Sequence, residues 1–298
     1  GADGMSGTPR PAAVQPTPAG PVGVFDSGVG GLTVLRDLLR ELPDERYIYF
    51  GDTGNCPYGV RPESEITQLS LNGAAFLLGR GAKIIVVACN TASSAAIGAL
   101  RAAWPQVKFI AVVPAVKPAA AMTRTGRVAV AATNSAARSA YLRGLIQQFA
   151  QGVEVYPVGC QLLVTLAEDG QLDGPEVERE IRRSIGPLLA KGIDVLALGC
   201  THFPAMRPVF ERVVGPDVRV IDSGAAVARQ TRRMLTAQRL LAAPDGGPAR
   251  EPRLPRPNDE FWRSGPNPAF ERVAGLLLGA PVEGRYAPEM LWSPESVV

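Results

Sequence analysis

Short apolar runs alternate with segments of helical spacing through the first half of the chain. The runs predict strands at residues 22–25, 47–50, 84–88 and 109–113, and the spaced segments predict helices at residues 32–42, 63–78 and 92–103. Positions 32, 35, 38, 39 and 42 place apolar residues on one face of the first helix, which Pro43 ends. Strands that alternate with helices in this way predict a parallel sheet.

The second half repeats this organisation after a joint at residues 114–118. Strands are predicted at residues 128–131, 153–157, 195–199 and 218–221, with helices at residues 138–149, 161–167, 176–191 and 204–213. Ligands of such sheets bind at the carboxyl ends of the strands. We therefore expect an α/β fold with two doubly wound parallel sheets that face one cleft, which holds the active site.

The two ends of the chain depart from this regular pattern. Residues 1–20 are rich in Gly, Ala, Pro and Thr without apolar periodicity, so we predict a disordered tail there. Residues 244–257 are proline-rich and predict a linker. Beyond it, residues 260–265 and a helix near residues 269–278 are expected to dock back onto the body, and the residues from about 287 to be loose.

Composition and charge narrow the class of protein. Hydrophobic residues make up 46% of the 298 residues, enough to bury the cores of two domains. The net charge of +3 comes from 31 basic and 28 acidic residues without a run of one sign, so no nucleic-acid partner is expected. No apolar run approaches the ~20 residues of a membrane span, and no signal segment is recognised. These features predict a cytoplasmic protein without a membrane partner.

Two cysteines occupy matching places in the two halves. Cys89 and Cys200 each follow a buried strand and precede a polar turn and a helix. The partial positive charge at a helix N-terminus favours a thiolate, so we expect a lowered thiol pKa at both positions. Two such thiols facing one pocket would serve general acid–base catalysis. A buried cysteine that acts only as a small hydrophobe is the alternative for each one taken alone.

Other residues offer weaker signals. The four cysteines, at positions 56, 89, 160 and 200, form no Cys-x-x-Cys pair, and His202 is the single histidine, so no metal site is predicted. Asp26 and Asp52 both follow strands, where a helix cap or an Asx-turn is the alternative to a catalytic role. Gly28 and Gly30 lie in a turn suited to an anion, but Thr33 occupies the third glycine position of the dinucleotide motif.

Four motifs together resemble the glutamate racemases of the cofactor-independent aspartate/glutamate racemase superfamily. They are Asp26-Ser27-Gly28, the loop at residues 52–59, Cys89-Asn90-Thr91 and Cys200-Thr201-His202, and the resemblance covers about residues 22–240. It implies two pseudo-symmetric domains, one at residues 21–115 plus 224–286 with a C-terminal extension, and the other at residues 116–223. It also implies a homodimer, and an isomerase that supplies D-glutamate for peptidoglycan synthesis and thus for cell-wall biogenesis and cell shape.

The resemblance also implies roles for individual residues. Cys89 would deprotonate D-glutamate and Cys200 would deprotonate L-glutamate at Cα, each thiol returning a proton to the opposite face. The other catalytic residues implied are Asp26, His202, Asp52 and Glu168. The implied substrate-binding residues are Asp26, Ser27, Pro57, Tyr58, Gly59, Asn90, Thr91, Thr133, Thr201 and His202.

No cofactor is expected for this chemistry. A pyridoxal enzyme would need a lysine, and none of the four lysines follows a strand in a recognisable cofactor setting. The chain departs from the family pattern at three places. Cys56 adds a third thiol near the expected pocket, Ala136 stands where a second threonine is usual, and Gln161 replaces a common proline.

Three other functions stay open on the sequence. Racemization of aspartate would change only the length of the substrate. A non-catalytic module could bind a phosphate or nucleotide at the turn of residues 28–31, although it leaves the paired cysteines unexplained. A protein-interaction role carried by the tails, such as the topoisomerase inhibition seen in some relatives, would be separable from catalysis by deleting them.

Overall fold

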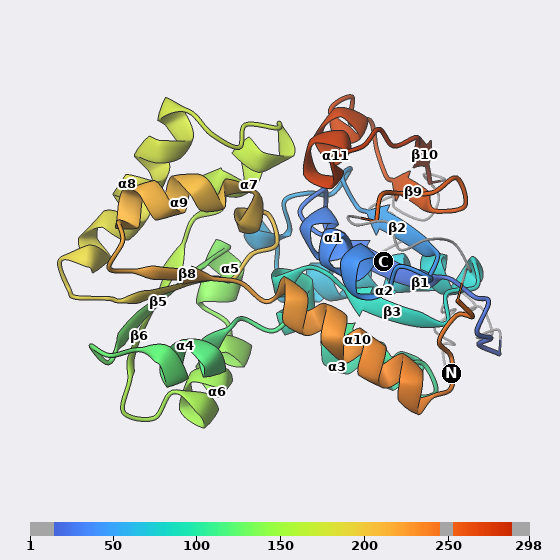
Figure 1. Ribbon diagram of the computed structural model, residues 1–298, viewed down its shortest axis with the longest axis horizontal. Helices are drawn as coiled ribbons and strands as arrows, with labels where there is room; N and C mark the ends of the chain where they lie inside the picture. Colours follow the sequence, from blue (N-terminus) through green and yellow to red (C-terminus); the bar gives the residue numbers. More distant parts are fainter. Residues whose placement is uncertain (1–14, 245–252, 288–298) are drawn as a thin grey trace, which may run out of the picture.

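The computed structural model describes residues 15–244 and 253–287, and these form two lobes that lie side by side (Figure 1). Each lobe is built on its own sheet, and every strand pair in both sheets is parallel. The expected α/β fold with two parallel sheets is therefore confirmed. None of the described helices is both long and apolar enough to traverse a bilayer.

The first lobe contains a six-stranded sheet. Its strand order is β10 (Gly284–Tyr286), β9 (Glu260–Arg263), β2 (Tyr47–Gly51), β1 (Val22–Asp26), β3 (Ile84–Val87) and β4 (Phe109–Ala111). One face is covered by α1 (Leu32–Glu41), α10 (Gly224–Ala237) and α11 (Phe270–Leu278), and the other by α2 (Glu63–Gly79) and α3 (Asn90–Ala103). The central strand β1 is completely buried, as expected for a strand covered on both faces.

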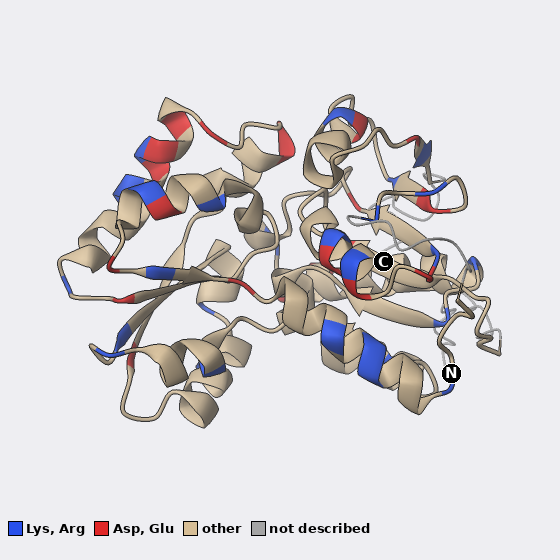
Figure 2. Cartoon of the chain, viewed as in Figure 1, with Lys and Arg blue, Asp and Glu red and all other residues tan. Residues whose placement is uncertain are grey.

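The second lobe contains a four-stranded sheet. Its strand order is β6 (Glu154–Gly159), β5 (Arg127–Ala132), β7 (Val195–Leu198) and β8 (Arg219–Ile221). Helices α7 (Gln161–Glu168), α8 (Pro175–Leu189) and α9 (Arg207–Val214) pack on one face, and α4 (Val116–Met122) and α6 (Ala140–Phe149) pack on the other. Charged residues of both signs are spread over both lobes (Figure 2), in keeping with the absence of a single-sign run in the sequence.

The chain crosses between the lobes twice, once from β4 to α4 and once from β8 to α10. The Ser223 hydroxyl on the second crossing donates to the Val113 carbonyl on the first, at 2.5 Å. The two crossings therefore lie side by side and connect the lobes at one edge.

Several elements differ from the prediction. Helix α4 begins inside the expected joint of residues 114–118. The short helix α5 (Asn134–Ala137) lies just before the expected helix of residues 138–149, where no helix was predicted, and α6 begins two residues later than expected. The side chains of Thr133 and Ser139 each accept a backbone N–H, so each caps its own helix and α5 stays separate from α6. Strands β9 and β10 were not predicted as strands. They extend the first sheet through the expected docking of the C-terminal segment.

The predicted tail and linker are only partly described. Within the tail, the Thr17 carbonyl accepts from Gly20 N and the Pro18 carbonyl accepts from Lys83 Nζ at 2.7 Å, so the chain contacts the first lobe before residue 21. Residues 1–14, 245–252 of the predicted linker and 288–298 of the predicted loose end lie outside the described residues. Past the undescribed part of the linker, Arg253 is buried in an ion pair with Asp259 at 2.6 Å.

Candidate active site

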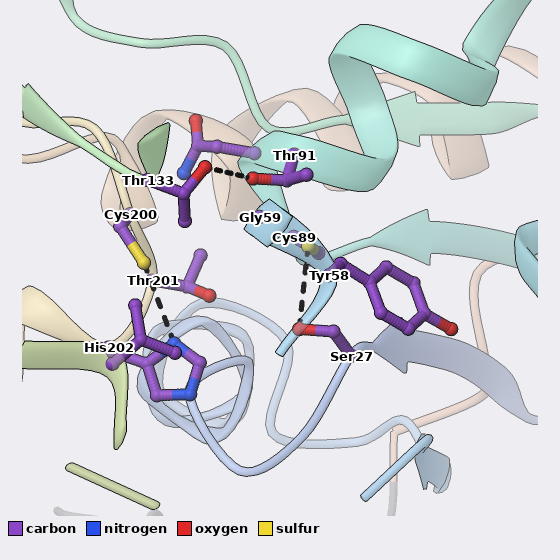
Figure 3. Close-up of a pocket in the computed structure, with 11 residues that line it drawn as sticks. Ser27, Tyr58, Gly59, Cys89, Thr91, Thr133, Cys200, Thr201 and His202 are labelled. Carbon is purple, nitrogen blue, oxygen red and sulfur yellow. Dashed lines mark hydrogen bonds between the residues drawn. The ribbon is translucent and has the colours of Figure 1, made fainter. Parts of the chain in front are cut away.

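The two paired cysteines line one cavity between the lobes (Figure 3). Cys89 is the N-cap of α3, where its Sγ accepts from Ala92 N at 3.3 Å and lies 3.7 Å from the hydroxyl of Ser27. Cys200 follows β7, and its Sγ lies 3.5 Å from Nδ1 of His202. The strand ends of the two separate sheets therefore bring two thiols into the same space, as the sequence pattern indicated.

The lining of this cavity is polar and comes from both lobes. It consists of Ser27, Tyr58, Gly59, Cys89, Asn90, Thr91, Thr133, Val164, Cys200, Thr201 and His202. All of these residues are buried, and the two cysteines are only 6% and 5% exposed. Every lining residue except Val164 was implied as a site residue by the sequence resemblance. The two lobes together therefore enclose most of this space.

The expected lowering of the Cys89 pKa is wrong for this structure. Burial removes the thiolate from water and the Asp26 carboxylate lies nearby, and both raise the pKa of Cys89. The hydrogen bonds from Ala92 N and with Ser27 act in the opposite direction but are outweighed. In the closed cavity burial therefore favours the protonated thiol of Cys89, and the helix N-terminus alone does not make it a thiolate.

His202 is held between Cys200 and Glu168. Its Nδ1 faces the Cys200 sulfur, and its Nε2 lies 3.5 Å from Oε2 of Glu168. Burial by itself lowers the pKa of His202, but Cys200 and Glu168 outweigh that effect and raise it well above its usual range. The imidazole is thus placed to hold a proton beside the second thiol.

The glycine-rich turn after β1 receives two side chains from the second lobe. A Cβ on Gly28 would come within 1.6 Å of Oε1 of Glu168, and a Cβ on Gly30 would come within 2.5 Å of Nδ1 of His202. The Val29 N–H donates to both carboxylate oxygens of Glu168, at 3.1 and 3.0 Å. Glycine is required here because the other lobe approaches so closely.

The same turn also binds a carboxylate of its own lobe. Gly28 N and Gly31 N both donate to Oδ2 of Asp26 at 3.0 Å, and the Tyr49 hydroxyl lies 3.3 Å from the same oxygen. Burial raises the pKa of Asp26, although His202 and these amides oppose the change. Since the protein's own carboxylates occupy the turn, the structure does not favour it as a phosphate site.

Asp52 lies behind the cavity rather than on its wall. Its carboxylate accepts from the Tyr58 hydroxyl at 2.5 Å, from the Asn55 amide at 3.0 Å and from the hydroxyl of Ser264. Burial raises the pKa of Asp52, and it outweighs these hydrogen bonds, which act to lower the pKa. Asp52 thus positions the loop that carries Tyr58. Three other implied residues, Asp26, Pro57 and Glu168, likewise do not line the cavity.

Several contacts close the lobes onto each other. The hydroxyls of Thr91 and Thr133 lie 2.5 Å apart across the junction, and the Thr33 hydroxyl donates to the Thr201 carbonyl at 2.7 Å. The sequence offered no signal for Thr33, which was noted only as an exception to a glycine motif. These bonds join the walls of the cavity directly, so they stabilise its closed form.

The three departures from the family pattern lie around the same junction. Ala136 is buried and its N–H donates to the Thr133 hydroxyl at 3.2 Å, while Gln161 accepts from Asn134 N at 3.0 Å. The sequence reasoning missed the positioning role of Gln161 because the side chain acts through tertiary contacts. Cys56 lies beside Glu168 and His202, and the three offer ligand atoms within 4.8 Å of one another. The sequence predicted no metal site because these residues are far apart along the chain.

Comparisons with known proteins found a matching family, similar sequences and similar structures. The family model described as Asp/Glu/Hydantoin racemase matches residues 25–231. Glutamate racemase from Pseudomonas paraeruginosa is 45% identical over 260 residues, which are 87% of this chain and 94% of that protein.

Two crystal structures of glutamate racemases are similar to this fold. The one from Escherichia coli, in complex with L-glutamate and the activator UDP-MurNAc-ala, has a TM-score of 0.75 and 34% identity and covers 92% of this chain and 98% of that chain. The one from Francisella tularensis, in complex with D-glutamate, has a TM-score of 0.78 and 28% identity and covers 91% and 98%.

Proposed function

This chain belongs to the Asp/Glu/hydantoin racemase family, and on that premise we propose that it interconverts L-glutamate and D-glutamate. The observation that carries the proposal is the pair of buried cysteines, one from each lobe, on the wall of a single cavity. Similar proteins that are glutamate racemases, two of them solved with D- or L-glutamate, support glutamate as the substrate.

The proposed reaction moves a proton off one face of Cα and returns another to the opposite face. On L-glutamate, Cys200 accepts the Cα proton with His202 beside it, and Cys89 donates its own proton from the other side. The raised pKa of Cys89 suits this step, because a thiol that holds its proton in the cavity is an available acid. The D-to-L direction exchanges the roles of the two thiols.

The carbanion-like transition state needs stabilisation where negative charge grows on the substrate carboxylate. The hydroxyls and amides of Ser27, Asn90, Thr91 and Thr201 are the donors that we assign to this task. None of the described residues that line the cavity is a lysine, and the proposal uses no cofactor. Burial of the donors makes each contact stronger than it would be in water.

Opening and closing of the lobes is part of the proposed cycle. The lining residues are buried and the Thr91–Thr133 contact spans the junction, so substrate must enter an open form and be enclosed before proton transfer. The two adjacent crossings between the lobes supply the connection about which they would separate.

The decisive experiment is racemization in heavy water. Purified protein incubated with L-glutamate is expected to form D-glutamate that carries deuterium at Cα. Cys89→Ala and Cys200→Ala are each expected to reduce racemization by at least about 10²-fold, the usual contribution of an acid–base group. Cys160→Ala is the matched control, since Cys160 is buried in the core of the second lobe and does not line the cavity. Undiminished racemization by Cys89→Ala would refute the two-thiol proposal.

Four finer parts of the proposal need separate measurements. Rates with aspartate and glutamate, compared at equal concentration, decide which amino acid is the substrate, and we expect glutamate to react faster. Sedimentation analysis tests the expected homodimer. Cell fractionation tests the expected cytoplasmic location, and a requirement for external D-glutamate after gene deletion tests the role in peptidoglycan synthesis.

A further inference from the structure

We infer that Cys56, Glu168 and His202 form a binding site for a zinc-type divalent cation at the junction of the lobes. Cys56 comes from the loop between β2 and the 3₁₀ turn at Tyr58–Val60, Glu168 is the last residue of α7, and His202 follows β7. One ligand atom of each lies within 4.8 Å of the others. The first lobe therefore contributes one ligand and the second lobe contributes two.

The spacing of the ligand atoms is close to what a tetrahedral ion requires. Zinc bonds of about 2.0–2.3 Å at tetrahedral angles place the ligand atoms about 3.3–3.6 Å apart. Nε2 of His202 and Oε2 of Glu168 are already 3.5 Å apart. The remaining separations, at most 4.8 Å, require a movement of about an ångström, which rotation of the partly exposed Cys56 side chain can supply.

A second observation concerns the Nε2 nitrogen of the histidine. His202 is only 3% exposed, and among the described residues its buried Nε2 makes no hydrogen bond of normal geometry, although Oε2 of Glu168 lies 3.5 Å away. Its Nδ1 faces Cys200, so the nitrogen directed at the cluster is the one left for a ligand. Glu168 accepts from Val29 N, but a carboxylate has about four lone-pair positions and retains capacity for a metal.

The donor set selects the kind of ion. A thiolate, an imidazole and a carboxylate suit Zn²⁺ or Co²⁺ far better than Mg²⁺ or Ca²⁺, which prefer oxygen ligands alone. Three protein ligands leave one tetrahedral position for water or for a substrate carboxylate. On binding, the protons held on the Cys56 sulfur and on Nε2 are released to solvent, and the ion keeps its charge of 2+.

Binding at this place has a functional consequence. The ion would occupy His202, which we place beside Cys200, and Glu168, which lies against the other side of the imidazole, and it would join the two lobes through Cys56. It is therefore expected to inhibit racemization reversibly. The inhibition rests on the proposed function, whereas the binding does not, so the two are measured separately.

Binding is tested on the full chain freed of metal by a chelator. Titration calorimetry with Zn²⁺ is expected to show one site, and Co²⁺ is expected to produce a sulfur-to-cobalt charge-transfer band. Cys56→Ala should abolish that band and weaken Zn²⁺ binding by more than about tenfold, since even indirect partners of a metal site contribute 10–100-fold. Cys160→Ala, the matched loss of a thiol elsewhere, should change neither signal.

Inhibition is tested with the same proteins. Zn²⁺ is expected to inhibit racemization by the wild type and by Cys160→Ala, and EDTA is expected to restore the rate. Cys56→Ala should keep its basal rate without Zn²⁺ and should need at least about tenfold more Zn²⁺ for the same inhibition. Equal Zn²⁺ affinity and an unchanged cobalt band in Cys56→Ala would overturn the inference and place the ion on Cys89 or Cys200. A protein without racemase activity that still shows the Cys56-dependent band would refute the proposed function and leave the site standing.

Discussion

Gly30→Ala tests how closely the histidine of the second lobe is held against the turn of the first. The φ angle of Gly30 is not left-handed, so alanine fits the backbone and only its Cβ matters. That Cβ would lie 2.5 Å from Nδ1 and 2.7 Å from Cγ of His202. Raising the closer separation to the 3.4 Å of ordinary contact requires a shift of about 0.9 Å.

The expected cost falls on catalysis more than on folding. A misplacement of about 1 Å in a catalytic arrangement can reduce the rate about 10²-fold, so kcat for L-glutamate should fall by about that factor. Overpacking of a closed core costs about 1–3 kcal/mol, which leaves a chain of this size folded. The turn cannot relax freely, because the amides on either side of Gly30 are bound by Asp26 and Glu168.

The assay compares kcat, KM and thermal midpoint of Gly30→Ala with those of Gly144→Ala. Gly144 lies on the exposed face of α6, and an added Cβ there meets nothing within 4 Å. This control should keep wild-type activity and gain stability of up to about 1 kcal/mol from its better helix propensity. A folded Gly30→Ala protein with wild-type kcat would refute the reasoning that the position of His202 is essential.

Three further predictions concern stability. Ser264→Ala removes the hydroxyl that donates to the buried carboxylate of Asp52, and urea unfolding should show a loss of about 1–3 kcal/mol; an unchanged unfolding midpoint would contradict this. Lys83→Met leaves Glu45 buried without its ion-pair partner at 2.6 Å, which should cost about 3–5 kcal/mol by the same method; a loss below about 1 kcal/mol would mean that the pair contributes little. Burial alone would raise the pKa of the Asp194 carboxyl, but the hydrogen bonds that it accepts outweigh burial and lower this pKa. The contribution of the Asp194 carboxylate to the stability of the fold is therefore present above about pH 4 and is lost as the pH falls through the lowered pKa. The thermal midpoint of Asp194→Asn should lie below that of the wild type at pH 7 and approach it as the pH falls through the lowered pKa of Asp194, whereas a deficit independent of pH would argue against the assignment.

Much of the architecture follows from local pattern. Runs such as residues 84–88 and 195–199 are continuously apolar because a strand covered by helices on both faces has no side exposed to water, and this requirement is visible in the sequence. The order of strands and helices then restricts the sheets to parallel ones. Strands β9 and β10 were missed because such short segments gain their form from pairing with their neighbours in the sheet rather than from their own pattern.

The motifs located the candidate site, but its physical chemistry depends on how the two lobes pack. The helix N-terminus suggested a lowered pKa for Cys89, and burial reverses that expectation because desolvation is set by everything around the thiol. Gly28 and Gly30 suggested a phosphate turn, yet side chains from the other lobe fill it. Distances between residues remote in sequence arise only when the chain folds, which is why the approach of Cys56 to His202 could not be read from their spacing.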